Sequence, residues 1–289
     1  MTVVPSNRER VLWPEAGFTK GAMLDYYAAV AGAIVPHLRD RPLTMRRFPE
    51  GVEQEGWYQY ECRGAPDWLR TVQIPYADGS RRRFCVVDDD RGLLWVANLG
   101  TVELHTHLHR IDALETPSYI VFDLDPGRPA DLADCCRVAL RVRDELAANG
   151  LAAFPKTSGS VGLHLYVPLN RGETYAATKA FARGLGHRLA HELPDEVVAR
   201  NARGARRGKV LVDWLQNDAS RSMIAPYSLR AMPWPTVSLP VTWDEVQHAA
   251  STGRADLLTF TADDVARRLE LHDDLFASVL TLEQPLPPA

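Results

Sequence analysis

The chain has 289 residues, of which 46% are hydrophobic and 24% are charged, the balance of a globular protein with a sizeable core. No apolar run approaches the roughly 20 residues of a membrane-spanning helix, and the first ten residues lack a secretory signal, so the sequence predicts a cytoplasmic protein with no membrane partner. The net charge of −4 excludes a uniformly basic nucleic-acid-binding surface, so phosphate binding would need local basic clusters.

Basic residues gather in three stretches although the chain as a whole is acidic. They are Arg46-Arg47, Arg81-Arg82-Arg83, and the run of Arg200, Arg203, Arg206, Arg207 and Lys209. Each stretch is compatible with a solvated loop or with a basic face directed at phosphates.

The four cysteines have no spacing typical of a zinc site or a redox dithiol. They are Cys62, Cys85, Cys135 and Cys136. In a cytoplasmic protein this pattern predicts reduced, partly buried thiols.

Hydrophobic periodicity predicts helices and strands that alternate along the chain. A helix is expected over 20–38, because apolar residues recur at helical spacing after Thr19, a typical N-cap. Strands are expected over 42–48 and 81–87, followed by a helix over 93–110. The later elements are a strand over 118–124, a helix over 132–149 closed by Gly150, a strand over 162–169, a helix over 175–193, a strand over 209–215, and helices over 243–250 and 262–271.

This alternation predicts an α+β (mixed α/β) fold in which helices flank central β-sheets, although spacing alone leaves the strand order open. The chain is expected to form a single domain over 1–289. Its approximate lobes are 1–115 and 116–280, and a Pro-rich tail covers 281–289.

Two aspartates lie at the end of an apolar strand, in Ser118-Tyr-Ile-Val-Phe-Asp-Leu-Asp-Pro-Gly. Residues two apart in a strand share a face, so Asp123 and Asp125 point the same way and Phe122 and Leu124 point into the opposite layer. Two adjacent carboxylates repel each other, and a divalent cation removes that cost. Solvated acids that cap the next helix are the alternative interpretation.

A third aspartate favours the metal interpretation. Asp213 lies within the apolar run Lys209-Val-Leu-Val-Asp-Trp-Leu-Gln-Asn, where an unpaired carboxylate would be costly to bury. Three strand-borne aspartates are what a two-metal phosphoryl-transfer site requires. The residue types therefore predict two Mg²⁺ or Mn²⁺ ions at Asp123, Asp125 and Asp213, which would be the catalytic residues.

A loop of small residues leads into another strand, in Lys156-Thr-Ser-Gly-Ser-Val-Gly-Leu-His-Leu-Tyr. Gly159 and Gly162 allow backbone N–H groups to approach phosphate oxygens, and Ser158 and Ser160 add donors. The loop lacks the Gly-Lys-Ser/Thr ending of a P-loop, so a β-turn followed by a core histidine, His164, remains an alternative.

The three segments, taken in order, resemble the motifs of the archaeo-eukaryotic primase superfamily and, more narrowly, the polymerase domain of bacterial DNA ligase D. The motifs are Asp123-Leu-Asp-Pro-Gly, Lys156-Thr-Ser-Gly-Ser with Gly-Leu-His-Leu-Tyr, and Asp213-Trp-Leu-Gln-Asn. The likeness covers about 6–245. It implies a primase-polymerase fold with an RRM-like catalytic lobe.

The resemblance also implies roles for further residues. Ser6-Asn-Arg-Glu-Arg-Val-Leu-Trp-Pro is similar to the family's opening motif, so Asn7, Arg10 and Lys20 are expected to bind a DNA 5′-phosphate. Trp57 and Tyr58 match an aromatic pair that stacks on template bases. The residues expected to bind the incoming nucleotide are Arg46, His105, Ser158, Ser160, His164, Gln216 and Arg230.

The implied activity is a DNA-directed nucleotidyltransferase that adds nucleotides, preferably ribonucleotides, to primer 3′ ends by two-metal catalysis. Its expected substrates are NTPs or dNTPs, and its cofactors are Mn²⁺ or Mg²⁺. The resemblance implies a role in non-homologous end joining or related repair, on DNA with gaps, overhangs or 5′-phosphorylated ends. Ku and a separate DNA ligase are candidate partners, and a nucleoid-associated place in the bacterial cytoplasm is expected.

The sequence departs from the family pattern at Val161, where the second motif usually has a lysine. A lost cation beside a triphosphate would cost roughly 1–3 kcal/mol of charge-assisted bonding. This departure favours an alternative function, a module that binds 5′-phosphorylated DNA ends with weak or no polymerase activity. A metal-dependent phosphatase or nuclease that uses the same acids is a third possibility.

Overall fold

The computed structural model describes residues 3–75, 79–200 and 204–287, so Arg203 and Pro288 lie outside the described part. The chain divides into two compact units, and each is described by itself. Unit 1 comprises Met1–Asp112, Ser222–Ser238 and Phe260–Asp273. Unit 2 comprises Ala113–Arg221, Leu239–Thr259 and Asp274–Ala289.

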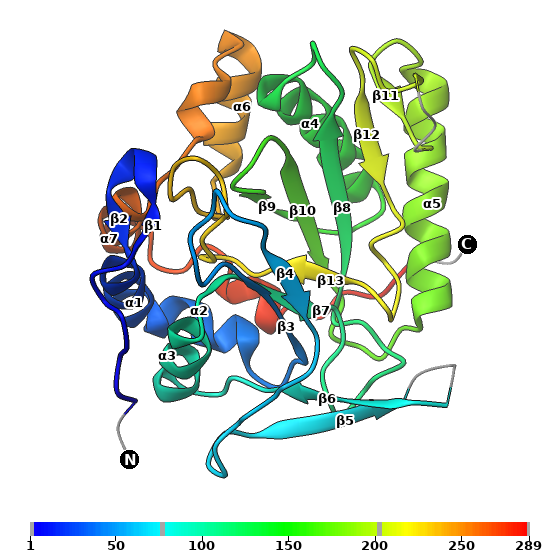
Figure 1. The fold of residues 1–289 in the computed structure, drawn as a ribbon. Coiled ribbons are helices and arrows are strands. Elements are labelled where there is room, and N and C mark those ends of the chain that lie inside the picture. Colours follow the sequence, from blue (N-terminus) through cyan, green and yellow to red (C-terminus); the bar gives the residue numbers. More distant parts are fainter. Residues whose placement is uncertain (1–2, 76–78, 201–203, 288–289) are drawn as a thin grey trace. The chain divides into compact units, whose positions relative to one another are not determined.

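Unit 1 contains an antiparallel sheet with the order β13-β7-β3-β6-β5, and β4 pairs with β3 (Figure 1). Its strands are β3 (Leu43–Arg47), β4 (Trp57–Gln59), β5 (Thr71–Pro75), β6 (Arg81–Cys85), β7 (Thr101–His107) and β13 (Ser222–Ile224), with a separate pair β1 (Val11–Trp13) and β2 (Phe18–Thr19). Its helices are α1 (Lys20–Ala29), α2 (Ala31–Leu38), α3 (Asp90–Asn98) and α7 (Ala262–His272), with a 3₁₀ turn at Pro14–Ala16.

Unit 2 contains a sheet with the order β11-β12-β8-β10-β9, so that β8 lies between β12 and β10 (Figure 1). Its strands are β8 (Tyr119–Pro126), β9 (Phe154–Thr157), β10 (Leu163–Pro168), β11 (Val197–Val198) and β12 (Val210–Asp213). Its helices are α4 (Leu132–Ala148), α5 (Tyr175–Glu192) and α6 (Trp243–Thr252), with 3₁₀ turns at Ala255–Leu258 and Ala277–Leu280.

Helices α4 and α5 cover one face of the unit 2 sheet. The Cys135 thiol of α4 donates to the Leu124 carbonyl at 3.4 Å. Gly186 of α5 lies against Val212, where an added Cβ would be 3.5 Å from the valine Cγ1. Val212 is opposite Leu124 in the β12–β8 pairing, so both side chains belong to the helix-covered face. Residues one position away along each strand therefore belong to the other face.

The long helix α4 shows why these segments become helices. Asp131 accepts hydrogen bonds from the N–H groups of Ala133 and Asp134, and the Asp134 side chain accepts one from the Asp131 N–H, which completes a capping box. Apolar residues at helical spacing face the sheet, and Gly150, with a φ of +73°, follows the C-cap. The helix predicted over 132–149 and closed by Gly150 is confirmed to within one residue.

The helix predicted over 93–110 is wrong in its second half. Helix α3 ends at Asn98, and 101–107 form strand β7. Gly100 has a φ of +77°, and an added Cβ would lie 2.8 Å from the Pro49 Cα, so the chain turns sharply there. Strand β7 pairs with β3 on one side and β13 on the other, and this tertiary pairing overrides the local helical pattern.

The helix predicted over 20–38 is also divided, because α1 and α2 are separated at Val30. The N-cap predicted at Thr19 is confirmed, since its side chain accepts from the Ala22 N–H at 3.1 Å.

The prediction of four reduced thiols is wrong for two of them. Cys62 and Cys85 form a disulfide with a Cα–Cα distance of 4.9 Å, and Cys135 and Cys136 are free and buried. The pairing arises because the segment after β4 lies beside β6, where the Cys62 N–H donates to the Arg83 carbonyl at 2.6 Å. A separation of 23 residues carries no local motif, so the sequence could not indicate it.

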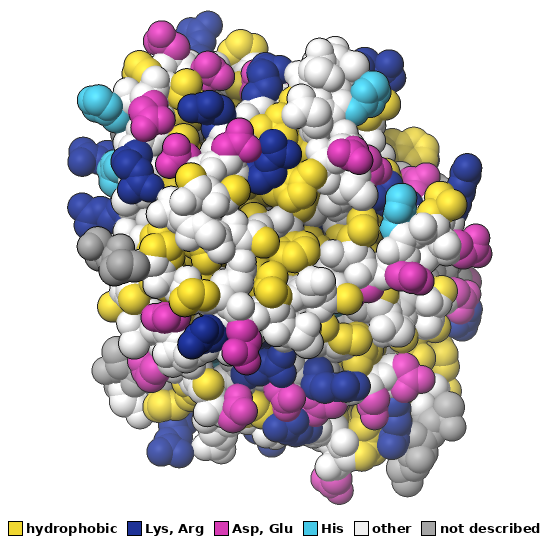
Figure 2. Space-filling view, turned by 180° about the vertical axis from the view of Figure 1, so that it is seen from behind, with side chains coloured by type: hydrophobic (Ala, Val, Ile, Leu, Met, Phe, Trp, Pro, Cys, Tyr) yellow, Lys and Arg dark blue, Asp and Glu magenta, His cyan; other side chains and the backbone are white. Residues whose placement is uncertain are grey.

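Two surface properties bear on function. Among the described residues, no helix is both long enough and apolar enough to cross a bilayer. On the face shown in Figure 2, Lys and Arg side chains are interspersed with Asp and Glu, in keeping with the net charge of −4. Phosphate binding therefore has to be sought in local clusters.

Candidate active site

Three aspartates lie on the face of the unit 2 sheet opposite to the one that α4 and α5 cover. The antiparallel register places Asp213 of β12 directly opposite Asp123 of β8, and Asp125 follows two residues later on the same face of β8. Phe122 and Leu124 are fully buried on the other face, as the alternation predicts. The sheet thus brings together acids that are 90 residues apart in sequence (213 − 123).

Two side chains after β12 hold this arrangement. The amide Nε2 of Gln216 lies 3.4 Å from Asp123 Oδ2 and 3.4 Å from Asp213 Oδ2, so it bridges the two carboxylates. The fully buried Asn217 accepts from the Val121 N–H at 2.8 Å and donates to the Val121 carbonyl at 2.7 Å. Asn217 therefore continues the sheet pairing beyond β12 and fixes the segment that carries Gln216.

The acids repel each other in the absence of a counter-charge. Burial raises the pKa of Asp213, the Leu215 N–H at 2.9 Å lowers it, and the negative charge of Asp123 raises it again; the net direction is upward. The raised pKa of Asp213 thus reflects burial first and the nearby charge of Asp123 second. A bound cation would relieve this repulsion.

A buried lysine and a histidine orient Asp123 from the other side. The Lys156 ammonium, which is fully buried, lies 3.0 Å from His164 Nδ1, and His164 Nε2 lies 3.2 Å from Asp123 Oδ1. Because an ammonium group only donates, His164 Nδ1 accepts and Nε2 carries the proton directed at Asp123. The predicted nucleotide ligand His164 thus contacts a predicted metal ligand. Sequence reasoning gave Lys156 no role.

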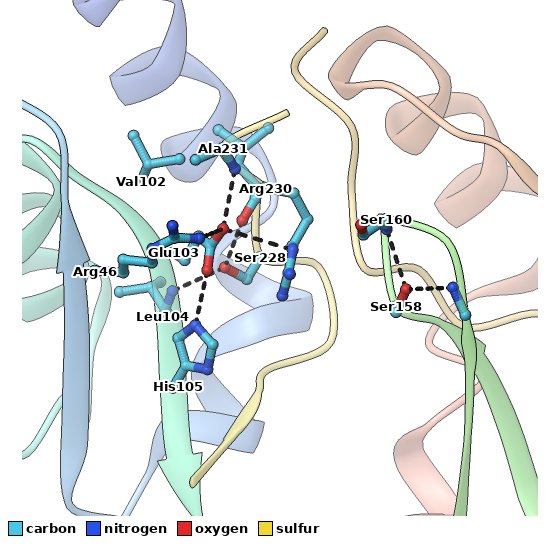
Figure 3. A network of polar contacts seen from close by, with 12 residues as sticks. Arg46, Val102, Glu103, Leu104, His105, Ser158, Ser160, Ser228, Arg230 and Ala231 are labelled. Atoms are coloured by element: carbon cyan, nitrogen blue, oxygen red, sulfur yellow. Dashed lines mark hydrogen bonds and ion pairs between the residues drawn. The ribbon is translucent and has the colours of Figure 1, made fainter. Parts of the chain in front are cut away.

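The loop before β10 packs tightly against the end of β8. An added Cβ on Gly162 would lie 2.4 Å from the Leu124 carbonyl oxygen and 3.5 Å from Asp125 Oδ1, so only glycine fits. The Ser158 hydroxyl accepts from the Ser160 N–H at 3.1 Å, as Figure 3 shows, and from the Gly162 N–H at 3.0 Å. Ser158 is therefore a loop-forming residue in this structure, and its hydroxyl holds the loop closed.

A basic segment supplies positive charge beside Asp125. Arg206 Nη2 lies 3.6 Å from Asp125 Oδ2. The approach depends on Gly127, because an added Cβ there would lie 1.9 Å from the Arg206 carbonyl oxygen. A hollow of 790 Å³ adjoins this point, and its lining includes Arg128, Arg207, Ser160 and the exposed Val161. Arginines thus line the same hollow as Val161, the position at which this chain departs from the family motif.

Three of the predicted nucleotide-binding residues meet at one buried carboxylate in unit 1. Glu103 of β7 is 1% exposed, and Figure 3 shows the side chains that converge on it. His105 Nε2 lies 2.9 Å from its Oε2, while Arg46 at 3.0 Å, Arg230 at 3.6 Å and the Ala231 N–H at 3.1 Å contact its Oε1. Glu103 therefore fixes Arg46, His105 and Arg230 relative to one another.

The charge state of this cluster follows from its surroundings. Burial would raise the pKa of Glu103, but His105, Arg230 and the Ala231 N–H lower it to about 2, so the carboxylate is ionised at neutral pH. Burial lowers the pKa of His105, which favours a neutral ring that donates its Nε2 proton to Glu103. Sequence reasoning missed Glu103 because 93–110 was interpreted as a helix. The signal that could have revealed Glu103 was its spacing of two residues from His105, which in a strand places both side chains on one face.

The other predicted DNA contacts in unit 1 differ in exposure. Trp57 and Tyr58 of β4 are 45% and 48% exposed. Lys20 is buried, its N–H donates to the Arg10 carbonyl at 2.7 Å, and its ammonium donates to the Ser6 hydroxyl at 3.1 Å. Burial lowers the pKa of Lys20, and the positive charges of Arg10 and then Arg47 lower it further. The side chain of Arg10 contacts Glu50 at 2.5 Å.

The expected site residues therefore form one group within each unit. Asp123, Asp125, Asp213, Gln216 and His164 share one sheet face or its edge in unit 2. Arg46, His105 and Arg230 share Glu103 in unit 1. Within the described part of the chain, no group of three or more His, Cys, Asp or Glu side chains is already arranged to hold a metal ion. The side chain of Asp125 is directed at Arg206, and that of Asp123 is shared between His164 and Gln216.

Comparison with known proteins identifies relatives of the chain. The family described as "LigD, primase-polymerase domain" matches residues 19–276. The "Multifunctional non-homologous end joining protein LigD" of Mycolicibacterium smegmatis is 37% identical over 275 residues, which are 94% of this chain and 35% of the relative. The "Bifunctional non-homologous end joining protein LigD" of Bacillus subtilis is 28% identical over 263 residues, which are 91% of this chain and 41% of the relative.

A solved structure is similar over almost the full length of both chains. The "Polymerase Domain from Mycobacterium tuberculosis Ligase D in complex with DNA" is 35% identical, with a TM-score of 0.91, over 98% of this chain and 99% of that chain. The chain spans about a third of the length of the mycobacterial LigD proteins that it matches. The expected mixed α/β fold is confirmed by this likeness, and the chain belongs to the LigD primase-polymerase domain family.

Proposed function

We propose that this protein is a metal-dependent nucleotidyltransferase of the primase-polymerase type, which adds nucleotides, preferably ribonucleotides, to primer 3′ ends at DNA gaps or breaks during non-homologous end joining. The observation that carries the proposal is the placement of Asp213 opposite Asp123, with Asp125 on the same sheet face. Family membership and the relatives' names support it.

The carboxylate oxygens of the three aspartates are the type of ligand atom that Mg²⁺ and Mn²⁺ prefer. The pKa of Asp213 is raised by burial and, to a smaller extent, by the negative charge of Asp123, and a cation held between the carboxylates would oppose both effects. Asp123 and Asp125 would hold both ions, and Asp213 would complete the set for one of them. Bound ions would supply activation of the primer 3′-hydroxyl and neutralisation of charge on the triphosphate.

The chain's own side chains would position these ligands. Lys156 and His164 orient Asp123 through a continuous run of hydrogen bonds, and Gln216 spaces Asp123 from Asp213. Arg46 and Arg230, fixed by Glu103, would offer guanidinium groups to phosphate oxygens, while His105 is held by the same carboxylate. Arg206 and Arg207 would add positive charge on the side of Val161.

Primer extension tests the proposal. With a labelled primer-template, Mn²⁺ or Mg²⁺, and NTPs or dNTPs, the protein should lengthen the primer, faster with NTPs. Asp123→Ala should abolish extension, whereas Asp144→Asn, at an exposed acid of α4 that pairs with Arg143, should retain it. An Asp123→Ala protein that still extends the primer, or shortening of the primer by the unchanged protein, would refute the proposed chemistry.

For DNA ends, we expect tighter binding to a 5′-phosphate than to a 5′-hydroxyl, through Asn7, Arg10 and Lys20. Glu50 competes for the Arg10 guanidinium, so Glu50→Gln should raise affinity for phosphorylated ends by about 3- to 10-fold at low salt. Electrophoretic or anisotropy titration with matched ends measures this. Equal affinity of the unchanged protein for both ends would remove the roles given to Arg10 and Lys20.

A module that binds 5′-phosphorylated ends with little synthesis is the second candidate, favoured by the exposed apolar side chain of Val161 beside Ser160. Val161→Lys separates the two candidates. If this variant converts an inactive protein into a polymerase, the natural chain is primarily a binder. If the unchanged protein already extends primers, the binding-only function is refuted.

A further inference from the structure

Three neighbouring aromatic side chains in unit 1 are exposed in a way that burial in the core does not explain. Trp57 and Tyr58 lie on β4 and Tyr60 follows it, and they are 45%, 48% and 42% exposed. We call Trp57, Tyr58 and Tyr60 the aromatic strip. Large aromatic side chains held at a surface contribute to recognition, because they bury much area at a low entropic cost.

The rings of Tyr58 and Tyr60 have nearly the same orientation. Their centroids are 6.4 Å apart and their planes differ by 23°. Successive bases of a single strand also present parallel faces, so two such rings offer contact surfaces to consecutive bases. Strand β4 pairs in register with β3, with Tyr58 opposite Arg46, and this pairing fixes the backbone under the strip.

Each ring of the strip has an arginine near its face. The guanidinium carbon of Arg47 is 5.2 Å from the Trp57 centroid, that of Arg46 is 5.5 Å from Tyr58, and that of Arg82 is 5.9 Å from Tyr60. A hollow of 430 Å³ adjoins the strip, with Arg63 and Arg82 among its lining residues. Among the described residues that line it, the acid Glu61 pairs with Arg63 at 2.8 Å. Guanidinium groups beside aromatic faces suit a single nucleic-acid strand, because the cations can bind its phosphates while the rings stack on its bases.

The segment that bears Tyr60 is anchored to the strand that bears Arg82. The disulfide of Cys62 and Cys85 joins this segment to β6. The Cys62 N–H donates to the Arg83 carbonyl at 2.6 Å, and Arg83 Nη2 donates back to the Cys62 carbonyl at 3.0 Å. Tyr60 and Arg82 are therefore held near each other before any ligand binds, which reduces the entropy lost on binding.

We propose that Tyr60 and Arg82 form a binding position for one more unpaired nucleotide, beyond the template bases assigned to Trp57 and Tyr58, with Tyr60 stacking on the base and Arg82 contacting its phosphate. This inference rests on the proposed function, since it takes single-stranded DNA at a break as the ligand. Recognition is independent of base identity, because every base has a stacking face.

Binding of DNA with overhangs of graded length tests the inference. The probe is a fluorescent duplex with a 5′-phosphate and a single-stranded 3′ overhang of zero to five nucleotides, titrated by anisotropy. Tyr60→Ala should weaken binding of the longer overhangs by about 5- to 10-fold and leave blunt and shortest-overhang DNA unchanged. Tyr60→Phe, which keeps the ring, should bind like the unchanged protein.

The contribution of Arg82 has its own readout. Arg82→Gln should weaken binding of the longer overhangs and reduce the slope of log affinity against log salt by about one. Arg267→Gln, at an exposed arginine of α7 in the same unit, is the charge-matched control and should leave the overhang-length dependence unchanged.

The outcomes separate this inference from the proposed function. If the unchanged protein extends primers and binds overhangs, but Tyr60→Ala and Arg82→Gln bind every length equally well, only the additional nucleotide position is overturned. The same holds if Tyr60→Ala weakens blunt and overhanging DNA equally, because the effect is then not on the unpaired strand. If the unchanged protein neither binds overhangs nor extends primers, the proposed function fails as well.

Discussion

Glu103 shows how a single buried charge can organise residues that would otherwise repel one another. Arg46 and Arg230 are both cations, and each approaches the same Oε1 atom, while His105 occupies Oε2. Without Glu103 the two guanidinium groups would face each other with no compensating charge. A buried carboxylate with this many partners acts as a positioning residue whose removal is costly.

We predict that Glu103→Gln lowers the free energy of unfolding by about 3–5 kcal/mol, because it leaves two partly buried arginines, Arg46 and Arg230, without their shared counter-charge. Urea denaturation at pH 7.5 measures the loss. Asp25→Asn, which removes the carboxylate from the exposed pair with Arg8, should change the same quantity by less than about 1 kcal/mol. Equal effects of the two substitutions would contradict the role given to Glu103.

Residue-scale prediction from the sequence succeeded in grouping Asp123 with Asp125 on one side of a strand, because the alternation of side chains depends only on the backbone. It did not predict the contact of Lys156 with His164, although Lys156 begins the motif that contains His164. The contact of its ammonium with His164 depends on the pairing of β9 with β10, which places His164 opposite Lys156.

At the scale of elements, the glycines next to β8 decide how the loop before β10 and the segment with Arg206 approach the acids. Gly162 and Gly127 lie where a Cβ would collide with backbone oxygen atoms. The sequence-based interpretation gave Gly162 a role in phosphate binding through exposed N–H groups. In this structure its N–H donates to Ser158, and its missing side chain allows close packing against the Leu124 carbonyl.

We predict that Gly162→Ala lowers primer extension by about 10- to 100-fold, because the loop must move away from Asp125 and the end of β8. Gly184→Ala in α5 is the matched control, since its nearest neighbour to an added Cβ is the Arg188 side chain at 3.9 Å. That control should keep full activity and gain about 0.5–1 kcal/mol in stability. Extension rates and thermal unfolding of both variants check the prediction, and full activity of Gly162→Ala would contradict it.

At the scale of the whole molecule, buried ionisable groups in unit 1 set the response to acid. Burial, then His109 and Arg41, lower the pKa of His107 from 6.5 to about 3, and burial, then Arg41, lower that of His109 to about 4. The pKa of Glu103 is about 2 against an ordinary value of 4.5. For all three groups, the unfolded chain binds protons at a pH where the folded protein does not.

We therefore predict that the free energy of unfolding falls as the pH decreases below about 6.5, because the unfolded chain takes up protons at His107 and His109. Below about pH 4.5, proton uptake by Glu103 in the unfolded chain adds to this decrease. Each group contributes a slope of up to about 1.4 kcal/mol per pH unit. Urea denaturation at pH 7.5, 6.5, 5.5 and 4.5 measures this. His107→Phe keeps the ring packed against Phe84 and should flatten the slope between pH 6.5 and 4.5. An unchanged slope in this variant would show that His107 is not a source of the effect.

The sequence by itself determined the features that depend on one element: the shared face of Asp123 and Asp125, the N-cap at Thr19, and the helix over 132–149 that Gly150 closes. Its ordered motifs also determined the family. These features follow from side-chain period, capping and turn chemistry, which act over a few residues.

Only the tertiary structure decided which distant residues meet. It placed Asp213 opposite Asp123, joined Cys62 to Cys85, made a strand of 101–107, and gathered Arg46, His105 and Arg230 around Glu103. Each of these outcomes is decided by pairing between strands or by contacts across a sheet. Their energies depend on partners far away in the sequence, so no local pattern contains them.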